Sequence, residues 1–213
     1  MIARAGVDAS KVRVTYVGTS IDIADATAVR QTLRADGPTR VLFVGREFSR
    51  KGVNALVEAA RRVVARGIDL RVTVIGPQRL DALPHSVDFL GYLDKPRTED
   101  KLALDRAYAN ADIFCLPTRR EPFGIAVAEA MFSGLPVVAT RLSAVPEMVD
   151  EGTTGFTVPV DDVEALTERL TTLAVDRELR LKMGTKGRER AIACFTWDAV
   201  AERVERALLE VCR

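Results

Sequence analysis

Short apolar runs alternate with helix-like segments along most of this chain. Runs rich in Val, Ile and Phe, bounded by Gly or Pro, predict strands over 40–44, 70–75, 87–90, 112–116, 136–139 and 155–158. Between them, apolar residues recur at helical spacing at Leu56, Val57, Ala60, Val63 and Val64, and again at Val163, Leu166, Leu170 and Leu173. This alternation predicts an α/β fold with a mostly parallel sheet covered by helices.

Helical patterns continue to the C-terminus, over 176–190 and then at Val200, Val204, Ala207, Leu208 and Val211. The beginning of the chain is less regular: residues 11–17 are compatible with a short strand, and 18–37 are polar with weak helical content. We therefore predict three parts: a lead-in or linker over 1–37, the sheet domain over 38–195 and a C-terminal helix over 196–213.

Composition narrows the class of protein. In 213 residues, 31 Lys and Arg against 30 Asp and Glu leave a formal charge of +1, so no bulk positive field favours nucleic acid or an anionic membrane. No apolar run approaches the roughly 18 residues that span a bilayer, and the first ten residues lack the apolar stretch of a signal peptide. We expect a globular protein of the cytoplasm.

Cysteine and histidine are too few for several common mechanisms. Cys115, Cys194 and Cys212 are odd in number and widely spaced, which fits neither a disulfide framework nor a zinc ribbon, so we expect reduced, structural thiols. His85 is the one histidine and lies in a loop-like stretch, so a multi-histidine metal site is excluded and we expect no metal. Arginine pairs such as Arg119-Arg120 are interpreted as compositional background.

The segment after the first strand has the composition of a phosphate-binding loop. Gly45 allows close approach of a ligand to the backbone, Arg46 offers a planar fork for oxygen pairs, and Lys51 places a compact charge near a helix start. The spacing misses the P-loop pattern, and G-x-G-x-x-G cannot be written anywhere on the chain. An ordinary strand-to-helix turn with solvated arginines is the alternative for this loop taken alone.

Two glutamates flank the start of a predicted helix over 123–133. Glu121 precedes a proline and falls in the loop, whereas Glu129 falls inside the helix, about 7.5 Å along its axis from Gly124. An anion at the N-terminus of the helix would place Glu129 near a nucleotide ribose, whose vicinal hydroxyls a carboxylate binds well. The alternative is an exposed helical glutamate and a loop glutamate that caps a neighbour.

These residues together resemble a known family. Glu121 and Glu129, within Glu-Pro-Phe-Gly and Glu-Ala-Met, are similar to the E-x7-E signature of family 4 GT-B glycosyltransferases, a large retaining group. The segments 112–118 and 133–140 are similar to the strands that flank this signature, and the loop 44–52 and the strand end 89–92 to the phosphate and base sides of the donor site. The resemblance covers the chain from about Lys11 onward.

The resemblance implies a Rossmann-like, doubly wound sheet with helices on both faces, the donor-binding C-terminal half of a GT-B enzyme. It implies a nucleotide-diphosphate sugar, linked to UDP, GDP or ADP, as donor substrate, with no cofactor or metal. Its implied roles are catalytic for Glu121 at the donor sugar and for Arg46 and Lys51 at the diphosphate, and binding for Gly45, Gly91, Tyr92, Phe123, Gly124, Ile125 and Glu129.

The resemblance also implies a partner. An N-terminal acceptor-binding domain, which nothing before Lys11 forms, would act in cis or in trans, and the last helix would cross toward it. Peripheral membrane association would come only through that half. The family often has two glycines shortly before a Pro-Glu pair, whereas this chain has Ser143 and Ala144 there.

Two other readings remain at this point. A noncatalytic nucleotide-binding or interaction module would keep the fold without sugar transfer. A glycoside hydrolase would use Glu121 and Glu129 as its carboxylate pair, which requires the two groups to lie about 5 to 9.5 Å apart across an open sugar site.

Overall fold

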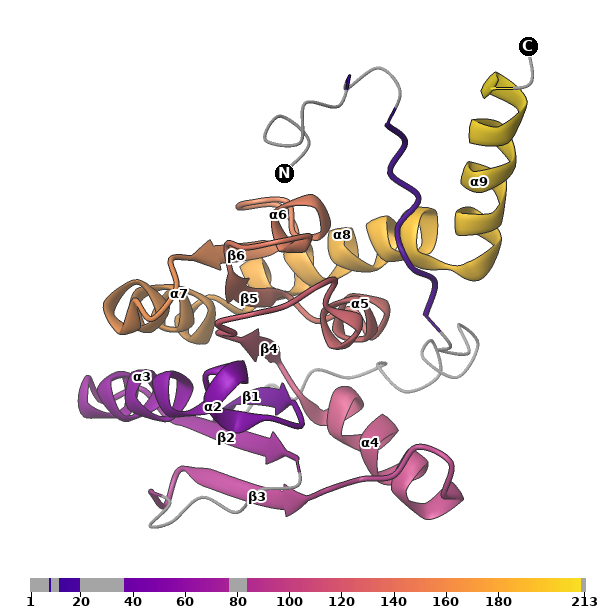
Figure 1. Cartoon of the computed structure of the whole chain (residues 1–213). Coiled ribbons are helices and arrows are strands. Elements are labelled where there is room, and N and C mark those ends of the chain that lie inside the picture. Colours follow the sequence, from indigo (N-terminus) through magenta and orange to yellow (C-terminus); the bar gives the residue numbers. More distant parts are fainter. Residues whose placement is uncertain (1–7, 9–11, 20–36, 77–83, 212–213) are drawn as a thin grey trace.

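The computed structural model describes residues 8, 12–19, 37–76 and 84–211. Strands and helices are interspersed from β1 (Thr39–Val44) to β6 (Gly155–Val158), with β2 and β3 consecutive among the described elements, and helices alone follow (Figure 1). The other elements, in chain order, are α2 (Phe48–Lys51), α3 (Val53–Ala65), β2 (Leu70–Ile75), β3 (Val87–Gly91), α4 (Thr98–Asn110), β4 (Ile113–Leu116), α5 (Ile125–Phe132), β5 (Val137–Thr140), α6 (Val145–Met148), α7 (Val163–Val175), α8 (Arg177–Phe195) and α9 (Trp197–Val211).

The six strands form one sheet in the order β3-β2-β1-β4-β5-β6, and every neighbouring pair is parallel. Val41 of β1 lies at the centre, in register with Val72 of β2 on one side and Ile113 of β4 on the other. All residues of β4, β5 and β6 are buried, which explains why these strands appear in the sequence as continuous apolar runs. The predicted Rossmann-like, doubly wound sheet is confirmed.

Helices cover both faces of the sheet. Helices α3 and α7 pack against each other on one face, and α5 and α8 do so on the other (Figure 1). The apolar stripe of α3 is buried at Leu56, Ala60 and Val63, as its spacing predicts, whereas Val64 is 41% exposed and lies outside the core. Four of the predicted apolar positions of α7 pack in or against the core: Val163, Leu166, Leu170 and Leu173.

The sheet has its topological switch point between β1 and β4. The chain leaves β1 toward β2 and leaves β4 toward β5, so the two following loops open on opposite sides and meet between the strand ends. The amide of Arg119 donates to the Arg50 carbonyl at 2.8 Å, and the Arg50 guanidinium donates to the Arg120 carbonyl at 2.7 Å. The two loops are therefore joined by hydrogen bonds.

Three local features differ from what the sequence patterns predict, for identifiable reasons. Residues 12–17, compatible with a strand in sequence, form no strand, because the segment runs beside α9 and pairs with no strand of the sheet. Helix α4 has no clear signal in the sequence, because it buries only Leu104 and Tyr108. The helix predicted over 123–133 begins at Ile125, because Gly124 adopts a left-handed conformation with φ 106°.

An aromatic cluster joins the N-terminal segment to the end of α8. The ring of Tyr16 lies 5.4 Å from Phe195 and 6.4 Å from Phe123, and Phe123 lies 5.9 Å from Phe195, centroid to centroid. Gly18 packs so closely on Trp197 that an added Cβ would lie 2.4 Å from the indole. The segment and α9 therefore lie side by side (Figure 1).

Helix α9 extends away from the body of the domain (Figure 1). Large apolar side chains on it remain exposed: Trp197, Val204, Leu208 and Leu209. The predicted division into 1–37, 38–195 and 196–213 stays a prediction, since 20–36 and 212–213 lie outside the described residues.

The contact between Gly52 and Pro117 makes a stability prediction. Gly52 has φ 77°, and an added Cβ would lie 1.8 Å from the Pro117 carbonyl oxygen; Gly67 has φ 81° with open space around the same position. Gly67→Ala should lower the free energy of unfolding by about 1–2 kcal/mol, the cost of the left-handed conformation. Gly52→Ala should cost more than about 3 kcal/mol, because the loops must also separate. Urea unfolding of both variants measures the difference, and equal losses would contradict the close packing of the loops.

Candidate functional site

Lys51 and Glu121 form the centre of the candidate site. The ammonium of Lys51, at the end of α2, donates to the carboxylate of Glu121 in the loop after β4. Both side chains are largely buried, with 14% exposure for Lys51 and 7% for Glu121. An added Cβ on Gly45 would lie 3.1 Å from Cγ of Lys51, so the glycine leaves room for the lysine stem. The predicted loop residues therefore lie together at the switch point.

The N-terminus of α5 adjoins this pair. A Cβ on Gly124 would lie 3.6 Å from Cγ of Glu121, so the helix begins beside the carboxylate. The amides of Val127 and Ala128 donate to the Gly124 carbonyl, whereas those of Phe123, Gly124 and Ile125 donate no hydrogen bond within the described part of the chain. The first turn contains no acidic residue. Amides at the start of a helix, together with the positive end of its dipole, are features that bind anions in many proteins.

Arg46 lies on the β3 side of the site. Its Cζ lies 4.9 Å above the centroid of the Tyr92 ring, and one terminal nitrogen donates to the Tyr92 hydroxyl at 2.9 Å. Gly91, with φ 78°, accepts a hydrogen bond from Gly76 at 2.9 Å, and an added Cβ on Gly76 would lie 2.2 Å from the Gly45 carbonyl oxygen. The ends of strands β1, β2 and β3 are thus in contact. The Arg46 guanidinium, however, contacts Tyr92 and not Lys51.

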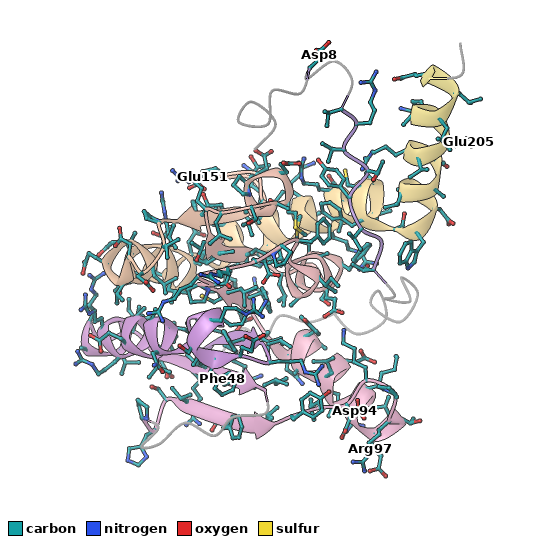
Figure 2. All side chains as sticks on the ribbon, in the orientation of Figure 1. Asp8, Phe48, Asp94, Arg97, Glu151 and Glu205 are labelled. Carbon is teal, nitrogen blue, oxygen red and sulfur yellow. The ribbon has the colours of Figure 1, made fainter. Side chains whose placement is uncertain are left out.

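Glu129 is buried, which argues against the alternative of an exposed helical glutamate. Its side chain is 7% exposed, and its carboxylate accepts hydrogen bonds from the Tyr108 hydroxyl at 3.0 Å and from the ammonium of Lys95. Burial, followed by the charge of Glu129, raises the pKa of Tyr108 well above its ordinary value. No sequence pattern singles out Tyr108 or Lys95, although Lys95 follows the end of β3, where ligand-binding residues gather. Figure 2 shows the neighbouring Asp94 where the chain leaves β3 for α4.

Arg119 has a structural role that the sequence analysis did not assign to it. Its guanidinium binds both oxygens of Asp161 at 2.7 and 3.0 Å and donates to the Ser49 carbonyl at 3.1 Å. It therefore links the segments that follow β1, β4 and β6, and the interpretation of this arginine as compositional background is wrong. Ser143, where the resembled family often has glycine, adopts φ 50°, a conformation that favours glycine.

The described residues also bear on other classes of site. Among them, no three His, Cys, Asp or Glu side chains cluster as metal ligands. Within the same ranges, no helix has both the length and the apolarity to cross a membrane. Cys115 and Cys194 are free thiols, as expected, and burial raises the pKa of Cys115; Cys212 lies outside the described residues.

Comparisons with known proteins identify a family and several proteins that this chain resembles in sequence or structure. Residues 25–190 match the family described as glycosyl transferases group 1. A phosphatidyl-myo-inositol mannosyltransferase of Propionibacterium freudenreichii subsp. shermanii is 36% identical over 203 residues, which are 92% of this chain and 50% of that protein. The sucrose-phosphate synthase of Thermosynechococcus elongatus has a similar structure, with a TM-score of 0.68 and 28% identity over 92% of this chain and 50% of that one.

A separately solved domain shows which part of such proteins has this fold. The C-terminal domain of a glycosyl transferase group 1 family protein from Francisella tularensis has a TM-score of 0.66 at 22% identity, over 90% of this chain and 100% of that one. The chain spans about half the length of the curated relatives that it matches.

The burial of Glu129 makes a second stability prediction. Glu129→Ala should lower the free energy of unfolding by about 1–3 kcal/mol, because it leaves the buried hydroxyl of Tyr108 without its acceptor. Glu205→Ala, on the exposed face of α9, is the control and should change stability by less than about 0.5 kcal/mol. Urea denaturation measures both variants, and an unchanged midpoint for Glu129→Ala would contradict the Tyr108 contact.

Proposed function

Because this chain belongs to the group 1 glycosyl transferases, we propose that it is the donor-binding half of a retaining glycosyltransferase that uses a nucleotide-diphosphate sugar. The observation that carries the proposal is the meeting of Lys51, Glu121 and the N-terminus of α5 at the switch point of the sheet. Nucleotide ligands of open parallel sheets bind at this position.

The diphosphate of the donor would bind at the amides that begin α5. Backbone N–H groups from Phe123 to Ile125 would donate to its oxygens, and Lys51, already held at this point by Glu121, would balance the charge. Arg46 would join them by turning from the Tyr92 hydroxyl toward the phosphates, since its side chain is exposed. These groups are fixed dipoles and charges of the kind that stabilise a leaving anion.

The remaining residues would hold the other parts of the donor. Glu129 would accept hydrogen bonds from the ribose hydroxyls, and Gly91 and Tyr92 would face the base at the end of β3. Glu121 would orient hydroxyls of the donor sugar and stabilise positive charge that develops at the reacting carbon. When the bond from that carbon to the diphosphate breaks, the electron pair would pass to the diphosphate oxygen. The acceptor hydroxyl would attack from the same face and give its proton to that oxygen.

The acceptor would bind to another part of the enzyme. Curated relatives are about twice as long as the matched region, and we propose that their other half corresponds to an acceptor-binding domain that acts with this chain, in cis or in trans. The apolar side chains exposed on α9, Trp197 and Leu208 among them, support a contact with such a domain. Transfer would therefore require both halves.

The carboxylate environment argues against a glycoside hydrolase. That mechanism needs one carboxyl group that donates a proton to the leaving sugar oxygen. Here each glutamate is bound by an ammonium group, Glu121 by Lys51 and Glu129 by Lys95. Carboxylates held in this way are suited to anchoring a ligand.

Nucleotide binding tests the proposed function directly. Isothermal titration of the chain with UDP, GDP and ADP should show binding of at least one diphosphate, and the matching nucleosides should bind more weakly because they lack the charge for Lys51 and the helix amides. If none of the three diphosphates produces a heat of binding, the proposal is overturned. Binding without transfer after addition of an acceptor-binding half would favour a noncatalytic module.

Arg46 has a distinct expected effect. Arg46→Ala should weaken diphosphate binding about tenfold, the value of one charge-assisted hydrogen bond, and leave nucleoside binding nearly unchanged. Arg71→Ala is the control, since Arg71 lies exposed on β2 with only a 3.8 Å contact to Asp88. Equal losses for diphosphates and nucleosides would contradict the proposed phosphate contact.

Lys51 should matter most for catalysis. In an active enzyme that contains both halves, Lys51→Ala should lower kcat about 10²- to 10³-fold, because a preorganised charge at the leaving group is lost. Thermal unfolding must accompany the assay, since Glu121 loses its buried partner in this variant. Lys186→Ala, at an exposed ion pair on α8, is the control, and a folded Lys51→Ala enzyme with unchanged kcat would contradict the role.

A further inference from the structure

We propose that the two oxygens of Glu129 have different roles: Tyr108 fixes one of them permanently, and Lys95 holds the other until a ribose replaces it. Tyr108 is then a positioning residue for ribose binding, and Lys95 is an internal competitor of the ligand. The inference rests on the proposed function, because it takes Glu129 as the ribose-binding carboxylate. It assigns roles to two residues that the sequence patterns do not single out.

Tyr108 is built to hold its hydroxyl in one place. It is 4% exposed, and its ring stacks on Phe114 of β4 with 6.1 Å between centroids and 27° between planes. The hydroxyl donates to Oε2 of Glu129 at 3.0 Å. Because burial raises its pKa well above the ordinary value, the phenol keeps its proton and remains a donor at physiological pH. The rotamer of Glu129 is therefore set by the core.

Lys95 makes the opposite kind of contact. Its ammonium binds Oε1 of Glu129, but its side chain is 56% exposed, against 7% for Glu129. It belongs to the loop between β3 and α4, which is held at Asp94, whose amide donates to Asp100 at 3.0 Å. An exposed lysine side chain loses little when its ammonium returns to water. The ammonium can therefore leave for water when a ribose hydroxyl takes its place at the buried carboxylate.

The two contacts make the site ready for a diol. Oε2 already accepts a hydrogen bond from the Tyr108 hydroxyl. Oε1 and the remaining lone pairs of the carboxylate are therefore left to accept hydrogen bonds from the ribose hydroxyls. Binding has to displace the Lys95 ammonium from Oε1, whereas the Tyr108 hydroxyl stays in place. Removal of Tyr108 and removal of Lys95 should thus change affinity in opposite directions, which a merely structural role for both would not produce.

Tyr108→Phe tests the positioning role, because it removes the hydroxyl and keeps the ring. Affinity is measured by titration with UDP, GDP and ADP and with their 2′,3′-dideoxy counterparts, which lack the diol. In the wild type the ribose form should bind more tightly, and in Tyr108→Phe this preference should fall about tenfold, the value of one hydrogen bond to a charged group. Tyr16→Phe, which removes a hydroxyl outside the site, should keep the preference.

Equal loss of affinity for ribose and dideoxy ligands in Tyr108→Phe would overturn the positioning role, and so would an unchanged preference. Thermal unfolding and circular dichroism establish that the variant is folded at the assay temperature. A Tyr108→Phe chain that does not fold would also overturn the role, since it would assign the hydroxyl to the fold alone.

Lys95→Met tests the displaceable contact, because methionine keeps most of the length of the stem without the charge. The variant should bind the ribose diphosphate about threefold or more tightly, since no ammonium competes for Oε1, and should bind the dideoxy form as the wild type does. Lys186→Met, which opens an exposed ion pair on α8, should leave both affinities unchanged. Weaker binding by Lys95→Met would overturn the inference, because it would make Lys95 a ligand contact.

The outcomes separate this inference from the proposed function. If the wild-type chain binds none of UDP, GDP and ADP, both fail. If the wild type binds a diphosphate with a clear preference for the ribose form, and Tyr108→Phe and Lys95→Met leave that preference unchanged, only the division of roles at Glu129 fails.

Discussion

The whole candidate site depends on the meeting of two loops between β1 and β4. Strand order brings the ends of these strands together. The absence of a side chain at Gly52 then lets the loops pack closely, because an added Cβ there would lie 1.8 Å from the Pro117 carbonyl oxygen. The Lys51–Glu121 ion pair then bridges them in a largely buried setting, where a charge without its partner would be costly. The same contact places a cation and an anion beside the first amides of α5.

Most of the fold follows from patterns in the sequence. Runs such as 70–75 and 155–158 match their strands residue for residue, because the strands of a parallel sheet covered by helices bury most of their side chains and are rich in Val, Ile, Leu and Phe. Helix α4 has no such signal, since Leu104 and Tyr108 are its only fully buried residues. A helix with so few buried side chains leaves too weak an apolar periodicity in the sequence to be predicted from it.

The candidate site was predictable in its positions but not in its contacts. Residues after strand ends were expected to gather, and Gly45, Lys51, Glu121 and Gly124 do so. Spacing places Glu129 on a helix but does not say which face of the helix it occupies. Its burial against Tyr108 depends on the packing of α4 against β4, which the spacing does not predict. The engagement of Arg46 by Tyr92 and of Arg119 by Asp161 likewise depends on loops that are distant in sequence.

The aromatic cluster of Tyr16, Phe123 and Phe195 has a mechanical consequence. Phe123 directly precedes Gly124, while Tyr16 belongs to the N-terminal segment and Phe195 ends α8 just before α9 begins. The three packed rings therefore connect the N-terminal segment and the junction of α8 and α9 to the residue before the N-cap of α5. Displacing either of these segments would require the rings to repack one residue away from the start of a central helix.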